Sequence, residues 1–306
     1  MSGTPFLKES MLESATESTY TRVIEALGGG SLSADDQLKL LLETPAENFW
    51  TKLPRDVPLF PAMDYDTIHV DPTFETLREG SVSAITAAVP GRQWCEAILI
   101  GDCQFDAHVL GLALKMRKPD TIASSFVQAV TETLSPYPGA AEEVLQAYRI
   151  NALLADADVV RPILTFASDI GFYAPAVSYA RAWSPNAYLY HLNEPNPWDG
   201  PNKGDCTHMF DVTLLFQNFN EKLPDQQRET GRQMAEHFIK FINGDAPFDR
   251  YEKQNPGAMV YGGPHQGAAF VRSDDAQDFG RRRMLSELAS KVPLDDLIIA
   301  LRKFIG

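Results

Sequence analysis

The sequence has few cysteines and no long hydrophobic run, and each shortage excludes a class of protein. Its 306 residues include three cysteines, Cys95, Cys103 and Cys206, which are too few for a disulfide framework. No basic segment leads into an apolar one near Met1, so we expect a cytoplasmic protein, or a secreted one if a longer precursor carries a signal peptide. No run of about 18 apolar residues occurs, so the sequence predicts no membrane span.

Positive charge is also scarce in this sequence. Lysine and arginine number 27 against 41 aspartates and glutamates, which gives a formal net charge of −14 and an isoelectric point near 4.8. A surface of this sign repels phosphate backbones and anionic lipid headgroups. We therefore expect no nucleic-acid partner and no binding to a membrane surface.

Motifs that hold metals are missing as well. The sequence contains no Cys-x-x-Cys pair, no His-Glu-x-x-His helix motif and no EF-hand loop. It therefore predicts no metal site, and it indicates no cofactor.

The sequence does contain enough apolar residues, 44% of the total, for one large domain or for one and a fraction. Apolar residues at helical spacing predict helices over residues 10–27, 34–42, 122–134, 144–153, 159–167, 174–183, 226–243 and 284–304, the last interrupted near Pro293. Gly28 is expected to end the first helix and Ser33 to cap the second, and Pro45 opens a short third helix. Compact apolar runs predict buried strands over 97–100 and 187–192, and a hairpin over 258–261 and 268–271. The mixture indicates an α/β protein in which helices outnumber strands.

Two of these expected strands are followed by loops that carry titratable residues. Gly101–Ala107 follows the first strand and contains Asp106, while Gly204–Val212 follows the second and contains His208. A histidine on a loop after a strand is where doubly wound hydrolases place their general base, and an acid on an earlier loop would orient it. On its own, each residue is also compatible with a purely structural role.

The nucleophile that such a pair would serve is missing from the sequence. No Gly-x-Ser-x-Gly elbow occurs, and the nearest string, Gly29–Ser33, lacks the final glycine and follows a predicted helix. Cys103 and Cys206 lie on or next to these two loops. Either cysteine could act as a nucleophile, but a small buried thiol with a structural role is the more common case.

The two loops and their order resemble the type-B carboxylesterase/lipase family. In that family a Tyr-Leu-Tyr strand, here Tyr188–Tyr190, leads through an irregular loop to a Gly-x-x-His-x-x-Asp/Glu run like the one around His208. A Gly-x-x-x-Asp-Glu-Gly run holds the acid and matches Gly101–Ala107, and Phe238–Pro247 matches a motif near the family's C-terminus. Gly204 stands one place early, Met209 replaces a small residue and Ala107 replaces a glycine.

The resemblance implies the fold and the roles of particular residues. It implies the C-terminal portion of an α/β-hydrolase fold, with a partial parallel sheet and many covering helices. Residues 1–306 would form a single partial domain that lacks the N-terminal half with the nucleophile elbow. Asp106 would be the acid of the triad and His208 its base, and Ser2 would fall on a serine that lies just behind the triad in the relatives.

The function implied by the resemblance is hydrolysis of a small carboxylic ester, with little activity expected from this chain alone. Three arrangements remain open. The chain could be completed by a separately made N-terminal half, could form a homodimer through the 122–134 and 284–304 helices, or could be a truncated product. The contrasting hypothesis is a non-catalytic, esterase-like interaction module, a pseudoenzyme that retains Asp106 and His208 for structural reasons.

Overall fold

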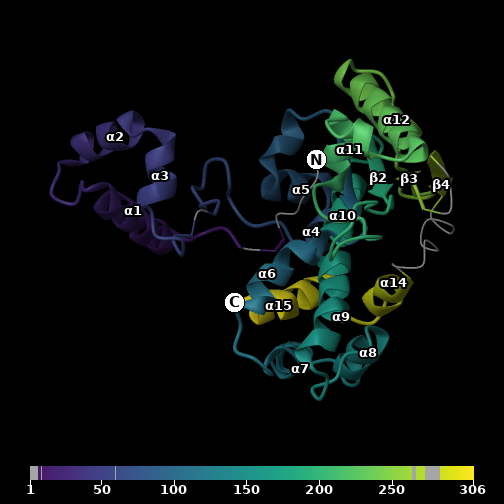
Figure 1. Cartoon of the computed structure of the whole chain (residues 1–306), viewed down its shortest axis with the longest axis horizontal. Helices are drawn as coiled ribbons and strands as arrows, with labels where there is room; N and C mark the ends of the chain where they lie inside the picture. Colours follow the sequence, from purple (N-terminus) through teal and green to yellow (C-terminus); the bar gives the residue numbers. More distant parts are fainter. Residues whose placement is uncertain (1–5, 8, 59, 264–266, 273–282) are drawn as a thin grey trace. The chain divides into compact units, whose positions relative to one another are not determined.

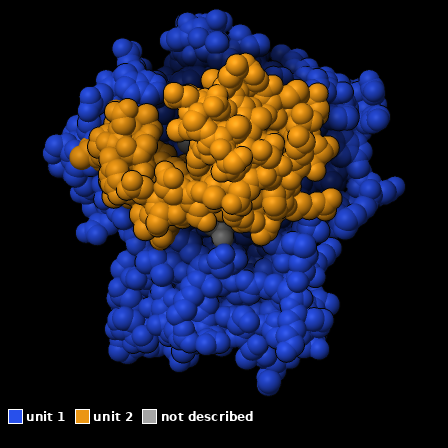
Figure 2. All heavy atoms as spheres, turned by 90° about the vertical axis from the view of Figure 1, so that its left-hand side faces the viewer, with its two compact units in different colours: residues 1–7, 72–86, 91–306 blue, residues 8–71, 87–90 orange. Residues whose placement is uncertain are grey.

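The computed structural model describes residues 6–7, 9–58, 60–263, 267–272 and 283–306 (Figure 1). Contacts divide the chain into two compact units, one formed by Met1–Leu7, Pro72–Thr86 and Gly91–Gly306 and the other by Lys8–Asp71 and Ala87–Pro90 (Figure 2). The single-domain organisation expected from the sequence stays a prediction.

The smaller unit contains the three helices expected near the N-terminus. They are α1 (Glu13–Leu27), α2 (Ala34–Glu43) and α3 (Ala46–Lys52). Helix α1 ends at Gly28, whose φ of 86° is the left-handed conformation that glycine adopts without a steric cost. Helix α2 begins after Ser33, whose side chain accepts the backbone N–H of Asp36 as the sequence predicts. The core of this unit is small and centres on Val23, Leu27 and Val57.

The larger unit alternates a few strands with many helices. Its helices and single turns are α4 (Phe74–Glu79), α5 (Val82–Ala88), η1 (Pro90–Gln93), η2 (Asp106–Leu110), α6 (Gly111–Lys115), α7 (Ile122–Thr133), α8 (Ala140–Ala147), α9 (Asp156–Ser168), η3 (Asp169–Tyr173), α10 (Ala174–Trp183), α11 (Phe210–Phe216), η4 (Asn220–Lys222), α12 (Asp225–Ile242), α14 (Arg283–Ala289) and α15 (Leu294–Ile305). The end of α5 and the first residue of η1 are assigned to the smaller unit. The break between α14 and α15 falls at the predicted place, because Pro293 precedes α15.

The described strands form one four-stranded sheet in the order β1-β2-β3-β4. They are β1 (Ile98–Cys103), β2 (Ala187–Leu192), β3 (Gly257–Tyr261) and β4 (Ala268–Arg272). The first three are parallel, and β4 returns antiparallel to β3, so the predicted hairpin is confirmed. The predicted α/β class, with a partial parallel sheet and many helices, is confirmed.

The sheet has helices on both faces. On one face Leu99, Tyr190 and Tyr261 pack with Leu214 of α11 and Met234 of α12 in a continuous apolar core. On the other face, η3 contacts β1, and α10 contacts β1 and β2. The parallel strands are therefore buried on both faces, which explains why β1 and β2 appear in the sequence as almost continuous apolar runs.

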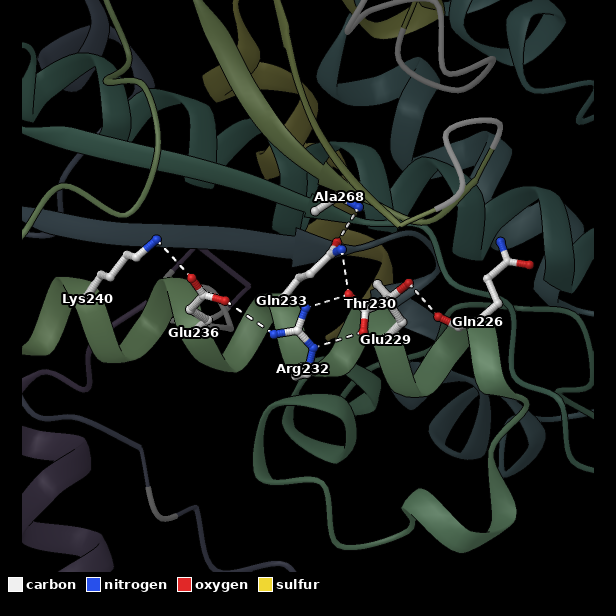
Figure 3. A network of polar contacts seen from close by, with 8 residues as sticks. All are labelled: Gln226, Glu229, Thr230, Arg232, Gln233, Glu236, Lys240 and Ala268. Carbon is white, nitrogen blue, oxygen red and sulfur yellow. Dashed lines mark hydrogen bonds and ion pairs between the residues drawn. The ribbon is translucent and has the colours of Figure 1, made fainter.

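Helix α12 shows how the covering helices divide their surfaces. Its outer surface carries an i,i+3 and i,i+4 ladder in which Arg232 pairs with Glu229 at 2.6 Å and Lys240 pairs with Glu236 at 3.0 Å (Figure 3). Gln233 lies between these charges and accepts the backbone N–H of Ala268 at 2.9 Å (Figure 3). This bond attaches the helix to the start of β4. None of the helices in the described part of the chain is long and apolar enough to cross a membrane.

Candidate active site

The loops after β1 and β2 lie side by side. Phe105 and Thr207 form an isolated parallel bridge, in which the backbone N–H of Phe105 donates to the carbonyl of Cys206 at 2.7 Å. Parallel strands bring their carboxyl ends to one edge of the sheet, and this bridge continues the pairing of β1 with β2 beyond that edge. Residues about a hundred positions apart in the sequence are thereby placed together.

Asp106 and His208 form a hydrogen-bonded pair at this edge. The Asp106 Oδ1 and His208 Nδ1 atoms are 2.8 Å apart. The second carboxylate oxygen of Asp106 accepts the backbone N–H of Cys103 at 2.7 Å, which fixes the plane of the carboxyl group. Asp106 is fully buried at the start of η2, whereas the side chain of His208 is 25% exposed. The pair therefore presents an imidazole toward solvent and keeps its carboxylate inside.

The electrostatics of this pair raise both pKa values. Burial raises the pKa of Asp106 to about 6, although the hydrogen bonds from His208 and from the Cys103 backbone oppose the rise. The hydrogen bond to Asp106 is the main reason that the pKa of His208 is raised, while partial burial of the ring acts against it. With Nδ1 occupied by Asp106, His208 retains Nε2 for proton transfer, which is the geometry of a base oriented by an acid.

Further contacts fix the position of the His208 ring. The backbone N–H of His208 donates to Nδ1 of His108 at 3.3 Å, and the ring of Phe172 lies 5.7 Å from the imidazole, edge to face. Burial and the nearby charge of His208 lower the pKa of His108. His108 therefore accepts a hydrogen bond as a neutral imidazole, which goes beyond the packing role that its place after Asp106 suggests.

An ion pair that the sequence did not indicate stabilises the loop before His208. Both guanidinium NH₂ groups of Arg161 reach the carboxylate of Asp205, at 2.9 and 2.6 Å, in a bidentate pair. The same guanidinium lies over the ring of Phe105 at 4.8 Å. Arg161 belongs to α9, so it joins both loops to a helix. No local pattern marks it, because its partners are distant in sequence.

No family model matches the sequence, and no curated protein matches it. Solved structures do match. A PNB esterase aligns with 90% of this chain and 55% of its own, at 18% identity and a TM-score of 0.53, and another structure of it gives 16% identity and 0.55 over 54% of its chain. A thermophylic PNB esterase aligns with 90% of this chain and 55% of its own, at 17% identity and 0.52.

The chain has part of an esterase fold. It spans about half the length of the esterases that it matches, which agrees with the partial fold predicted from the sequence. The resemblance predicted from the motifs is confirmed in fold. At this level of identity the likeness shows the fold alone.

The cysteines beside the site do not have the properties of nucleophiles. Cys103 and Cys206 are free thiols, and both are fully buried. Burial, followed by a hydrogen bond with Cys206, raises the pKa of Cys103 well above its usual value. Cys103 is therefore a thiol rather than a thiolate at neutral pH, and the complete burial of both side chains favours a structural role for the pair.

The remaining predicted site residue is Ser2, which lies outside the described residues. The described part of the chain contains no group of three or more histidine, cysteine, aspartate or glutamate residues that could hold a metal.

A second histidine–carboxylate pair, which the sequence analysis missed, lies within the sheet. His191 of β2 stands opposite Asp102 of β1 in the strand register, and its Nδ1 is 2.5 Å from Asp102 Oδ1. Both side chains are almost completely buried. The sequence did not indicate this pair, because the first expected strand ended before Asp102. Only the observed register shows that the two residues face each other.

Proposed function

We propose that this chain supplies the acid and the base of a serine-type carboxylic-ester hydrolase, and that the serine comes from a segment outside these 306 residues. The single observation that carries the proposal is the Asp106–His208 hydrogen bond at the edge where β1 and β2 end. The buried carboxylate holds one imidazole nitrogen, and the partly exposed ring offers the other.

In this mechanism His208 Nε2 accepts the proton of a serine hydroxyl as that hydroxyl attacks the ester carbonyl. It then returns the proton to the departing alkoxide, and Asp106 stabilises the imidazolium between the two steps. The raised pKa of His208 suits this exchange, since a base is most efficient when its pKa is near the working pH. No Gly-x-Ser-x-Gly elbow occurs in the sequence, so the chain alone should be a poor catalyst.

The alternative function is an esterase-like module that binds a partner without catalysis. The observation that favours it is the same missing elbow. In this alternative Asp106 and His208 serve to join the two loops, and their hydrogen bond has a structural role only. A homodimer or a complex with a separate N-terminal half remains compatible with either function.

The test is labelling with a fluorophosphonate probe, which reacts with activated serines. The chain would be purified alone and together with whatever polypeptides accompany it in the cells that make it, and adducts would be located by intact-mass measurement. We expect no adduct on this chain, and an adduct on an accompanying polypeptide that is lost in His208→Ala and in Asp106→Ala. His237→Ala is the matched control, because His237 bonds to Tyr261 and not to a carboxylate.

Each outcome of this experiment decides between the functions. An adduct on this chain that disappears in His208→Ala would show that a nucleophile is present here and that our assignment of the serine is wrong. A stable complex that carries no adduct and that survives His208→Ala would favour the binding module over the hydrolase.

A further inference from the structure

A cavity of about 370 Å³ lies against the face of the sheet that α10 covers. Its wall is formed by Leu189 and His191 of β2, by the start of β3, by one side of α10 and by residues of α4, α14 and α15. Neither Asp106 nor His208 belongs to its lining. Its volume falls in the range of roughly 300–1,000 Å³ that is typical of small-molecule sites.

The charge of this lining is opposite to that of the whole chain. Among the residues that the structure describes, the lining contains Arg78, Arg181 and His191 and no aspartate or glutamate. The chain as a whole has a net charge of −14, so the charged side chains of the described lining have the opposite sign. Tyr251 also lines the cavity, and burial raises its pKa while Arg181 and Arg78, close to its phenol oxygen, oppose the rise. The two guanidinium groups are therefore directed at the same region.

The two arginines have different structural roles. Arg181 is already engaged, because its Nε donates to the carbonyl of Arg78 at 2.8 Å and its guanidinium pairs with Glu79 at 3.4 Å. The guanidinium of Arg78 takes part in none of the hydrogen bonds or ion pairs among the described residues, although the residue is partly buried. Because the described residues leave this guanidinium unpaired, its donors are available for a ligand, and a planar carboxylate matches their geometry.

The third basic group, His191, is held in a fixed orientation. Asp102 occupies its Nδ1, so Nε2 is the ring nitrogen that remains for a ligand. Tyr173, another lining residue, lies over the imidazole with ring centroids 5.1 Å apart.

The rest of the wall is apolar. Ala174 and Val177 lie on the same side of α10 as Arg181, at helical spacing, and Leu189 lies two residues before His191 on the same face of β2. An inorganic ion would leave this apolar surface uncovered, whereas an organic ligand with an alkyl body would cover it. The combination points to an amphiphilic anion.

We propose that this cavity binds a small organic carboxylate, with its carboxylate at Arg78 and its apolar body against Val177 and Leu189. The site is separate from the Asp106–His208 pair, so it stands whether or not the chain takes part in ester hydrolysis.

The experiment is isothermal titration calorimetry of the full chain with hexanoate. Hexanamide, which has the same shape but no charge, and acetate, which has the charge but no alkyl body, are the matched ligands. We expect hexanoate to bind, and both matched ligands to bind at least about tenfold more weakly, which corresponds to about 1.4 kcal/mol. Arg78→Gln should weaken hexanoate binding by a similar factor.

Lys115→Gln is the control variant, because it removes one positive charge from an exposed position of α6 that does not line the cavity. It should bind hexanoate as the unmodified chain does. Arg78→Gln removes no described contact of the side chain and should fold normally. The proposal is wrong if hexanoate does not bind, if hexanamide or acetate binds equally well, or if Arg78→Gln and Lys115→Gln have the same effect.

Discussion

The two histidine–carboxylate pairs of this protein use the same two groups in different surroundings. The Asp106–His208 pair lies on loops beyond the strand ends, and its imidazole is partly exposed. The Asp102–His191 pair lies within β1 and β2, and the strand register holds both side chains in place. The two pairs also interact, because the charge of Asp102 contributes to the raised pKa of Asp106.

The difference shows how exposure separates chemistry from stability. A loop pair can present one ring nitrogen to a substrate because solvent and ligands reach it. In the pair between strands both side chains are almost completely buried, so removing one of them disturbs the hydrogen bonding and packing of the core. We therefore expect the first pair to matter mainly for protonation and reaction, and the second mainly for stability and for the cavity that it borders.

The largest expected effect is on the free energy of unfolding. His191→Ala removes the imidazole from a buried carboxylate and should cost about 3 kcal/mol, the lower end of what breaking a buried pair costs. His208→Ala should cost about 1 kcal/mol, because Asp106 keeps the N–H of Cys103. Urea unfolding of the two variants beside the unmodified chain measures both values. Equal losses would mean that burial does not distinguish the pairs.

The next effect is the pH dependence of stability at the loop pair. The pKa of Asp106 rises from 3.8 to about 6 in the folded chain, so its contribution to stability is complete below 3.8 and is lost as the pH rises through about 6. The pKa of His208 is also raised, so its contribution disappears in the same direction at higher pH. The unmodified chain should therefore lose stability relative to Asp106→Asn as the pH rises.

Urea unfolding at a series of pH values, carried out on both proteins, measures this difference. If the difference between the unmodified chain and Asp106→Asn stays constant across this range, the raised pKa of Asp106 is contradicted.

The smallest effect is a change in one pKa value. Asp106→Asn removes the charged acceptor that is the main cause of the raised pKa of His208, so that pKa should fall. An NMR titration of the His208 ring protons measures the shift. The matched control is Asp199→Asn, which removes a charge from an exposed position of the loop between β2 and His208. For this variant we expect no change in the pKa of His208. A His208 pKa that stays the same in Asp106→Asn would show that the carboxylate does not set it.

Much of the fold follows from local signals in the sequence. Ser33 predicts the start of α2, Gly28 the end of α1, and Pro293 the break before α15, because each acts through its own backbone or side chain. Compact apolar runs also predict the β3–β4 hairpin and the strand that contains Tyr188. Asp106 and His208 could be selected because each lies on a loop that follows a strand, and the resemblance to esterases identified the two loops.

Other features could not be inferred from local patterns. Arg161 approaches Asp205 and Phe105 from a separate helix, and nothing near it in sequence indicates those partners. The five-residue π-helical turn η3, between α9 and α10, was not predicted either, although it places Tyr173 over His191. Such contacts depend on how helices pack on the sheet, and packing depends on side chains from many elements at once.

The sequence alone determined the longer helices, the strands and the candidate acid and base, because caps and periodicity act over a few positions and the resemblance to esterases selected the two loops. Only the tertiary structure decided that Asp102 faces His191 across 89 residues, and that a basic cavity lies beside them. The register of parallel strands is set by burying both faces of the sheet together, and this global condition has no local signal in the chain.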